Sequence, residues 1–201
     1  MLWVGWFGFN GGSALAANGD AGMAILVTHL SAASAAFAWM CLEWFKFGKP
    51  SALGAVTGMV AGLGTITPAS GFVGPGGALI IGLAAGVICF NATIFLKQKL
   101  GVDDSLDVFP VHGVGGALGT ILVAVFASST LGVFSGQGDG LAMLDQFSIQ
   151  VLGVIATGGY TAVLTFALLK FVDLAIGLRV SDEEEMQGLD INQHNERGYD
   201  N

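Results

Sequence analysis

The sequence predicts an all-α protein that crosses a membrane several times. Of its 201 residues, 53% are hydrophobic and only 11% are charged, whereas soluble globular domains carry roughly 25% charged residues. The mean hydropathy is +0.72. The charges lie in short islands, and the uncharged stretches between them approach the roughly 20 apolar residues that a transmembrane helix needs.

Six apolar segments follow from this pattern. They cover residues 1–13, 21–45, 51–67, 76–95, 107–127 and 147–178. The first is too short to span a bilayer unless the chain begins inside a helix. The last is long enough to tilt or to project into water. We therefore expect a membrane domain over residues 1–178 and a separate tail over residues 179–201.

The basic residues predict the orientation of these segments. The seven are Lys46, Lys49, Lys97, Lys99, Lys170, Arg179 and Arg197. With six crossings, all of them fall on one side, which the positive-inside rule makes cytoplasmic. This topology predicts a multi-pass protein of the inner (plasma) membrane, with Ser13 at the outer face and the C-terminus in the cytoplasm.

The tail accounts for most of the net charge of −8, since residues 179–201 hold seven acidic residues and two arginines. Such a polar end is either a disordered solubilising segment or a docking element. Composition slightly favours the first interpretation.

Glycine predicts how the segments pack. The 32 glycines recur at four-residue spacing in three segments. These runs are Gly54, Gly58 and Gly62; Gly82 and Gly86; and Gly115 and Gly119. In lipid, small residues at this spacing let helix backbones approach closely. The pattern favours one tightly packed bundle without a wide aqueous pore.

His112 is the candidate that points to a function. It lies in an apolar segment, where ionisable side chains are costly and usually face a pathway or a partner. Pro110 constrains the helix start: with Asp107 as the N-cap, proline falls in the first turn, where it is tolerated. A start at Asp103 or Asp104 would place His112 deeper, and all three acids are candidate helix caps. His112 is thus either a pore-lining imidazole, which we favour, or a histidine bonded to a neighbouring helix.

The N-terminal run offers a second candidate site. Residues 3–13 read WVGWFGFNGGS, which is either an aromatic belt at the membrane interface or a cation site. Aromatic faces attract desolvated cations, and Ser13 could accept a hydrogen bond from one. His29 lies in the second segment, and we favour an interhelical hydrogen bond for it over a transport role.

Four motifs together resemble a known family. They are WVGWFGFNGGS at 3–13, TITPASG at 65–71, DVFPVHGVGG at 107–116 and GLRV at 177–180, followed by an acidic tail. They resemble the ammonium transporters of the Amt/Mep/Rh superfamily, in its bacterial Amt branch. The family fold has eleven transmembrane helices, of which ten form two inverted repeats of five. By resemblance, this chain corresponds to helices 6–11, the second repeat plus the long last helix.

The resemblance implies roles for individual residues. His112 matches the second of two histidines that line the narrow pore. Phe9 matches one of two stacked phenylalanines that gate the outer entrance, and Ser13 matches a hydroxyl that helps to recruit ammonium there. Thr67 matches a threonine near the conduction path, and Asp104 and Asp107 match acidic residues at the cytoplasmic end.

The implied function is ammonium transport: the ion is recruited outside and ammonia crosses a hydrophobic, histidine-lined pore, with or without a separately relayed proton. The resemblance also implies a homotrimer in a lipid bilayer and a PII-type signalling partner at the tail. The alternative is a non-transporting membrane fragment or the remnant of an ammonium-sensing relative. No catalytic triad or metal cluster is evident, so we expect no enzyme activity, no cofactor and no nucleic-acid partner.

The first repeat has no counterpart in this sequence. The partner histidine, the other gate phenylalanine and the recruiting tryptophan belong to that repeat, and neither His29 nor Trp6 matches their positions. We therefore expect the chain to be a fragment or partial product, or to work beside a separate N-terminal half.

Overall fold

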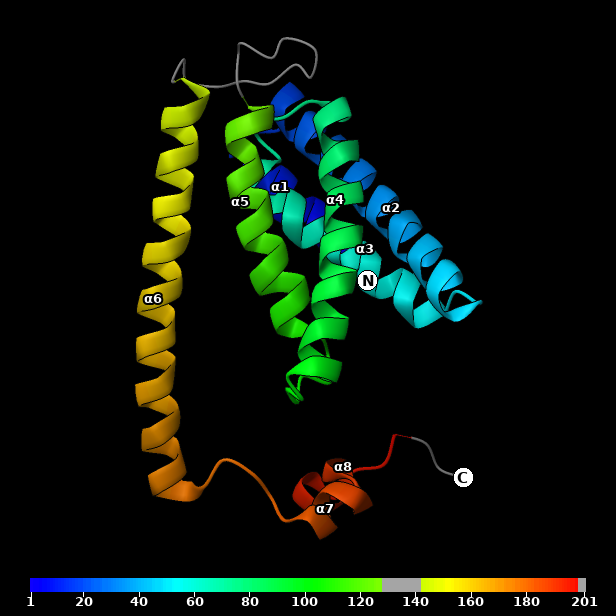
Figure 1. Cartoon of the computed structure of the whole chain (residues 1–201), viewed down its shortest axis with the longest axis vertical. Coiled ribbons are helices and arrows are strands. Elements are labelled where there is room, and N and C mark those ends of the chain that lie inside the picture. Colours follow the sequence, from blue (N-terminus) through cyan, green and yellow to red (C-terminus); the bar gives the residue numbers. More distant parts are fainter. Residues whose placement is uncertain (128–141, 199–201) are drawn as a thin grey trace. The chain divides into compact units, whose positions relative to one another are not determined.

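The computed structural model describes residues 1–127 and 142–198, and within them every regular element is a helix. The helices are α1 Leu2–Gly12, α2 Gly19–Phe47, α3 Ala52–Ile66, η1 Thr67–Ala69, α4 Pro75–Ile94, η2 Phe95–Lys99, η3 Phe109–Val114, α5 Gly115–Phe126, α6 Met143–Ile176, α7 Asp182–Gln187 and α8 Leu189–His194. Helices α1 to α5 form a bundle, coloured blue to green in Figure 1.

Within the described residues, five helical stretches are long and apolar enough to cross a membrane. They are Gly19–Phe47, Ala52–Ala69, Pro75–Lys99, Phe109–Phe126 and Met143–Ile176. Helix α1 has 11 residues and is too short to span alone, as the sequence predicts. The expected all-α, multi-pass membrane fold is confirmed.

Local capping explains where the helices begin and end. The Asn18 side chain accepts hydrogen bonds from the backbone N–H groups of Asp20 and Ala21 at the start of α2. Ser51 Oγ accepts from Gly54 N at the start of α3, and side-chain oxygens of this kind satisfy the free donors of a first turn. Gly48 ends α2 with φ 79°, a left-handed conformation that glycine adopts without strain.

Glycines let α2, α3 and α4 pack with their backbones in contact. A methyl group on Gly62 would lie 2.5 Å from the Ser31 carbonyl oxygen, and one on Gly86 would lie 2.6 Å from that of Ala35. Ser31 Oγ donates a buried hydrogen bond of 2.9 Å to the Gly62 carbonyl. The close approach predicted from the glycine spacing is present at these positions.

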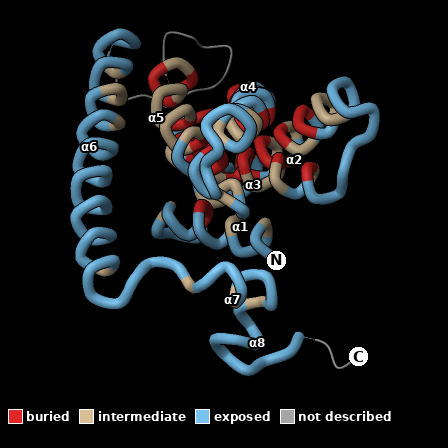
Figure 2. The backbone as a smooth tube through the Cα atoms, turned by 60° about the horizontal axis from the view of Figure 1, so that its bottom comes forward, coloured by how far each residue is buried: buried red, intermediate tan, exposed pale blue. Residues whose placement is uncertain are grey.

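Buried residues concentrate inside the α1–α5 bundle, as the red segments of Figure 2 show. One apolar cluster joins Val27, Ile66, Ile81, Val123 and Phe126, with smaller neighbours. A second joins Trp39, Ala61, Cys89, Phe90 and Val111. These clusters hold α3 between its neighbours, and α3 is the helix along which the candidate site is arranged.

The chain divides into two compact units, Met1–Val154 and Ile155–Asn201, with α6 crossing the boundary. No residue of α6 is buried, although its composition is that of a membrane span. In the tail, Ser181 and Glu184 form a reciprocal capping box at the start of α7. Arg179 pairs with Glu185 at 2.8 Å. The described part of the tail thus contains two short helices, α7 and α8.

Candidate functional site

The indole of Trp6 is the centre of the candidate site. Its Nε1 donates a hydrogen bond of 2.8 Å to Thr67 Oγ1. Its ring stacks on that of His112, with centroids 6.2 Å apart and planes at 11°. Phe9 meets the same indole edge-on, at 6.2 Å and 75°. Three side chains singled out from separate sequence motifs therefore converge on one tryptophan.

His112 is presented by a turn of π-helix. The segment η3 is π-helical and contains Pro110 in its first turn, where the missing N–H of proline is tolerated. π-turns are rare and often occur at functional sites. A methyl group on Gly64 of α3 would lie 3.7 Å from His112 Nδ1, so the imidazole passes close to α3 without a clash. In this chain His112 is exposed.

An open apolar groove borders this constellation on α1. It has a volume of about 410 Å³ and is lined by Met1, Leu2, Gly5, Trp6 and Phe9. The Phe9 side chain is 61% exposed. The rings of Trp6 and Phe9 thus line this groove, whose opposite side is open.

Ser13 lies one turn beyond Phe9, at the C-cap of α1. Its Oγ donates a hydrogen bond of 2.7 Å to the Phe9 carbonyl, and the residue is exposed. Because the proton of the hydroxyl is used in this way, its lone pairs remain available to accept from a cation. Ser13 and Phe9 are adjacent, as their proposed common role requires.

The acidic residues at the other end of the bundle differ from the simplest sequence interpretation. Asp104, and not Asp107, supplies the capping carboxylate, since its two oxygens accept from Val108 N and Phe109 N at 2.9 Å each. Asp107 has φ 55°, a left-handed conformation, so this residue is not part of the helix that follows it. Its carboxylate instead meets Lys97 Nζ at 2.7 Å.

A pocket of about 170 Å³ lies at the Asp107 end. Its polar lining comes from Glu43, Ser51, Thr57, Thr93 and Asp107. Aromatic side chains of α2 and α4 complete the wall. The pocket lies beside the first turns of α3.

Helix α3 connects these places in order. Thr57 lines the pocket at the Asp107 end, Gly64 lies beside His112, and Thr67 binds Trp6. At 1.5 Å per residue, Thr57 and Gly64 are about 10 Å apart along the helix. Thr57, Gly64 and Thr67 therefore place the Asp107 pocket, His112 and Trp6 in this order along α3 and η1.

Comparisons with known proteins identify the family. The sequence profile of the Ammonium Transporter Family matches residues 1–199. The chain belongs to this family. It is 48% identical over 200 residues to the ammonium transporter Amt1 of Archaeoglobus fulgidus, covering 99% of this chain and 50% of that protein. It is 43% identical over 201 residues to the ammonium transporter of Bacillus subtilis, covering 99% and 49%.

Solved structures of Amt and Mep proteins have the same fold. A "Sensor Amt Protein" superposes with a TM-score of 0.87 at 35% identity, covering 96% of this chain and 46% of that one. Mep2 of Saccharomyces cerevisiae superposes with a TM-score of 0.77 at 37% identity, covering 86% and 42%. This ammonium transporter family member spans about half the length of the curated relatives it matches.

Two polar contacts of this Amt-family chain were missed from the sequence. One is the Trp6–Thr67 hydrogen bond. The other joins α1 to α2, where Asn10 Nδ2 donates to Thr28 Oγ1 at 2.9 Å in a buried site. A buried asparagine in an apolar helix needs a partner, so Asn10 was a detectable signal. Nothing local in the sequence identifies Thr28 or Thr67 as the acceptor.

His29 forms a separate cluster. Its ring lies 5.0 Å from that of Trp3 and 6.0 Å from that of Phe7. The expected interhelical hydrogen bond is not among the contacts described for His29, which are ring contacts. His29 therefore lies outside the places that α3 and η1 connect.

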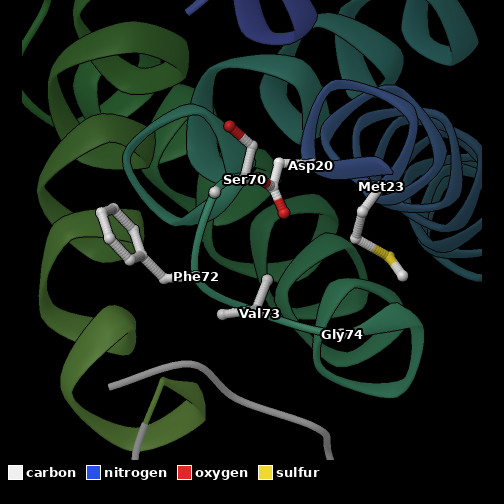
Figure 3. Close-up of a pocket in the computed structure, with 7 residues that line it drawn as sticks. Asp20, Met23, Ser70, Phe72, Val73 and Gly74 are labelled. Carbon is white, nitrogen blue, oxygen red and sulfur yellow. The ribbon is translucent and has the colours of Figure 1, made fainter. Parts of the chain in front are cut away.

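Figure 3 shows a smaller pocket at the Ser13 end of the bundle. It has a volume of about 110 Å³ and is lined by Asp20, Met23 and residues 70–74. Ser70 Oγ donates to the Thr67 carbonyl at 3.2 Å, which links this pocket to the threonine that binds Trp6. The Ser13 end thus carries a carboxylate and a hydroxyl close to the candidate path.

Proposed function

We propose that this chain supplies the second half of an ammonium transport domain. The observation that carries the proposal is the convergence of Phe9, Thr67 and His112 on Trp6, within 6.2 Å between ring centroids and one hydrogen bond of 2.8 Å. This arrangement joins three residues that the family resemblance assigns to one path.

The distribution of basic residues supports a defined orientation. Lys97 and Lys99 lie at the Asp107 end of the bundle, and the positive-inside rule makes that end cytoplasmic. Ser13, Asp20 and Ser70 then face outside. The protein lies in the plasma (inner) membrane, and its tail lies in the cytoplasm.

Ammonium recruitment takes place at Ser13 and Phe9. The ring of Phe9 attracts the ion through its π-face, and the Ser13 hydroxyl accepts a hydrogen bond from it. A full charge at the bilayer centre is expensive, so the ion gives up a proton before it passes Trp6. Potassium has no proton to give up and is therefore rejected.

Neutral ammonia then passes His112. An imidazole donates from one nitrogen and accepts at the other, which suits guidance of a small polar molecule through an apolar constriction. If the proton returns outside, transport is electrically neutral. If it crosses by a separate relay, transport is electrogenic, and current measurements distinguish the two.

We place the N-terminal half against the open side of the groove at Trp6 and Phe9. That half brings the partner histidine, a second gate phenylalanine and the recruiting tryptophan. Asp104 and Asp107 mark the cytoplasmic end of the pore. The complete protein is a homotrimer, and the tail contacts a PII-type signalling protein.

Reunion of two halves tests the proposal. We would co-express this chain with the N-terminal segment encoded directly upstream or, where that is lacking, with the first half of the Archaeoglobus fulgidus relative, in bacteria without ammonium uptake. We expect growth on low ammonium and uptake of labelled methylammonium. The same split made in the Archaeoglobus fulgidus protein controls for reassembly. A correctly inserted pair without uptake, beside a working control, contradicts the proposal.

A second candidate function is ammonium sensing without transport, and the likeness to the "Sensor Amt Protein" supports it. A sensor would bind ammonium and show no uptake. Ammonium-dependent protection of the tail from proteolysis, in a protein that fails the uptake assay, would favour this function.

A further inference from the structure

Asp107 holds an ammonium group in this structure, namely the side chain of Lys97. The two charged groups are 2.7 Å apart, and their side chains are 16% and 37% exposed, respectively. Asp107 Oδ1 is buried and makes no aligned hydrogen bond, so the contact with Lys97 Nζ is one between charges. The carboxylate thus holds a partly exposed cation at close range without an aligned hydrogen bond.

The position of this pair connects it with the places along α3. Asp107 lines the same pocket as Thr57. Thr57 lies about two helical turns before Gly64 on α3, and Gly64 lies beside His112. The other carboxylate of the pocket, Glu43, is already occupied, since it accepts from Ser51 N at 2.6 Å and from Ser51 Oγ at 3.2 Å. Asp107 is therefore the carboxylate of this pocket placed to meet ammonium, which forms when ammonia leaving the path takes a proton from water at the cytoplasmic end.

The chemistry of Lys97 matches that of the cation. A lysine side chain ends in a primary ammonium group with three N–H donors and acts as a compact point charge. It is an ammonium ion carried on a tether. A short flexible tether gives an effective concentration on the order of millimolar, so Lys97 competes with free ammonium for the same carboxylate.

We propose that Lys97 is a tethered ammonium that fills a cytoplasmic cation site at Asp107 and thereby prevents the exit from retaining the ammonium that forms there by protonation of the transported ammonia. The proposal rests on the proposed function, which supplies the released ammonia. Without Lys97, the half-buried carboxylate binds ammonium or a small alkylammonium ion, and product that has reached the cytoplasm slows further uptake.

The transport test uses the reunited halves in proteoliposomes loaded with ammonium chloride or, as the ionic control, choline chloride. Uptake of labelled methylammonium is compared among the wild type, Lys97→Met and Lys97→Arg, with Lys99→Met as the matched control on the same turn. We expect internal ammonium to slow Lys97→Met several-fold relative to the other three proteins. Equal sensitivity of all four overturns the proposal, because a purely structural ion pair would change the basal rate without creating inhibition by internal product.

A binding test does not depend on transport. The thermal unfolding of detergent-purified Lys97→Met is followed against ammonium chloride and choline chloride. We expect ammonium to raise the Tm of Lys97→Met, while Lys97→Met/Asp107→Asn and the wild type respond to both salts alike. An identical response of all three proteins overturns the proposal. If the wild type does not transport but Lys97→Met gains this response, the proposed function fails and the cation site stands.

Discussion

The two histidines of the bundle, His29 and His112, both contact a tryptophan, but only the tryptophan beside His112 has a described hydrogen bond. Both are exposed, and each packs its ring against a tryptophan of α1, Trp3 at 5.0 Å and Trp6 at 6.2 Å. Trp6 Nε1 is bonded to Thr67, whereas Trp3 Nε1 is buried and has no hydrogen-bond partner among the described residues. The same pair of residue types therefore belongs to a hydrogen-bonded cluster in one place and to an aromatic contact in the other.

The backbone explains part of the difference. His112 stands on the π-helical turn η3, next to the hydrogen-bonded start of α5. His29 stands within the regular helix α2. π-turns are rare and often occur at functional sites, and this one carries the histidine that lies beside α3. An imidazole beside a tryptophan therefore does not by itself distinguish the two sites. The difference is the hydroxyl of Thr67, which binds the indole N–H beside His112.

The largest expected effect separates the two histidines directly. In the reunited transporter, we expect His112→Ala to abolish methylammonium uptake or to change its selectivity strongly. His29→Ala is the matched control and should keep most of the uptake, because its described contacts are with Trp3 and Phe7 only. Equal loss in both variants would remove the distinction, and unaltered uptake in His112→Ala would remove His112 from the mechanism.

The contact that holds α1 against α2 supports both tryptophans. Thr28→Val removes the acceptor of the Asn10 amide and leaves a buried donor without a partner, which costs about 1–3 kcal/mol. We expect a lower thermal unfolding temperature in detergent. Thr57→Val is a control of the same shape change at a hydroxyl that bonds only within its helix, to the Leu53 carbonyl. A drop no larger than that of the control would show that the Asn10 bond contributes little.

The tryptophans themselves give a smaller contrast. Trp6→Phe keeps a ring beside His112 but loses the hydrogen bond to Thr67, a net stabilisation of about 1 kcal/mol. We expect a several-fold slower uptake. Trp3→Phe removes a buried N–H that has no partner, so we expect little loss of stability or uptake beyond that of the smaller ring. A larger defect in Trp3→Phe than in Trp6→Phe would reverse the assignment of the two clusters.

These contrasts also mark how far the sequence could lead. The spans predicted at 21–45 and 51–67 match Gly19–Phe47 and Ala52–Ile66 closely, because hydrophobic length and caps such as Ser51 are local. The sequence offers Asp103, Asp104 and Asp107 as candidate caps without choosing among them. In the structure Asp104 caps the helix start, while the Asp107 carboxylate pairs with Lys97. That outcome depends on Lys97, ten residues earlier on another helix.

The centre of the site was out of reach for a related reason. Trp6 and Thr67 are 61 residues apart, and no periodicity of either segment pairs them. Motif resemblance nominated Phe9, Thr67 and His112 separately. Phe9 lies one turn from Trp6 on α1, but Thr67 of η1 and His112 of η3 reach the indole only through tertiary packing. Residues that act by holding others, such as Trp6, have no local signal that distinguishes them from aromatic belt residues.

The smallest expected effect lies in the tail and provides a pH reference remote in sequence from both histidines. The backbone N–H of Ser181, and then its hydroxyl, bond the Glu184 carboxylate and hold its pKa below the ordinary value of 4.5. A lowered pKa in the folded state means that the capping box stabilises α7 fully above pH 4.5 and is lost as the pH falls through the lower value.

We therefore expect the Ser181 amide signal in NMR spectra of the tail to titrate below pH 4.5, and Glu184→Gln to remove that transition. Glu183→Gln is the matched control, because it deletes a neighbouring charge of α7 and leaves the capping box intact. A transition that survives in Glu184→Gln would assign the acid response to another carboxylate. In that case the capping box at Ser181 and Glu184 would not be the group that titrates, and the acid response of the tail could not be assigned to α7.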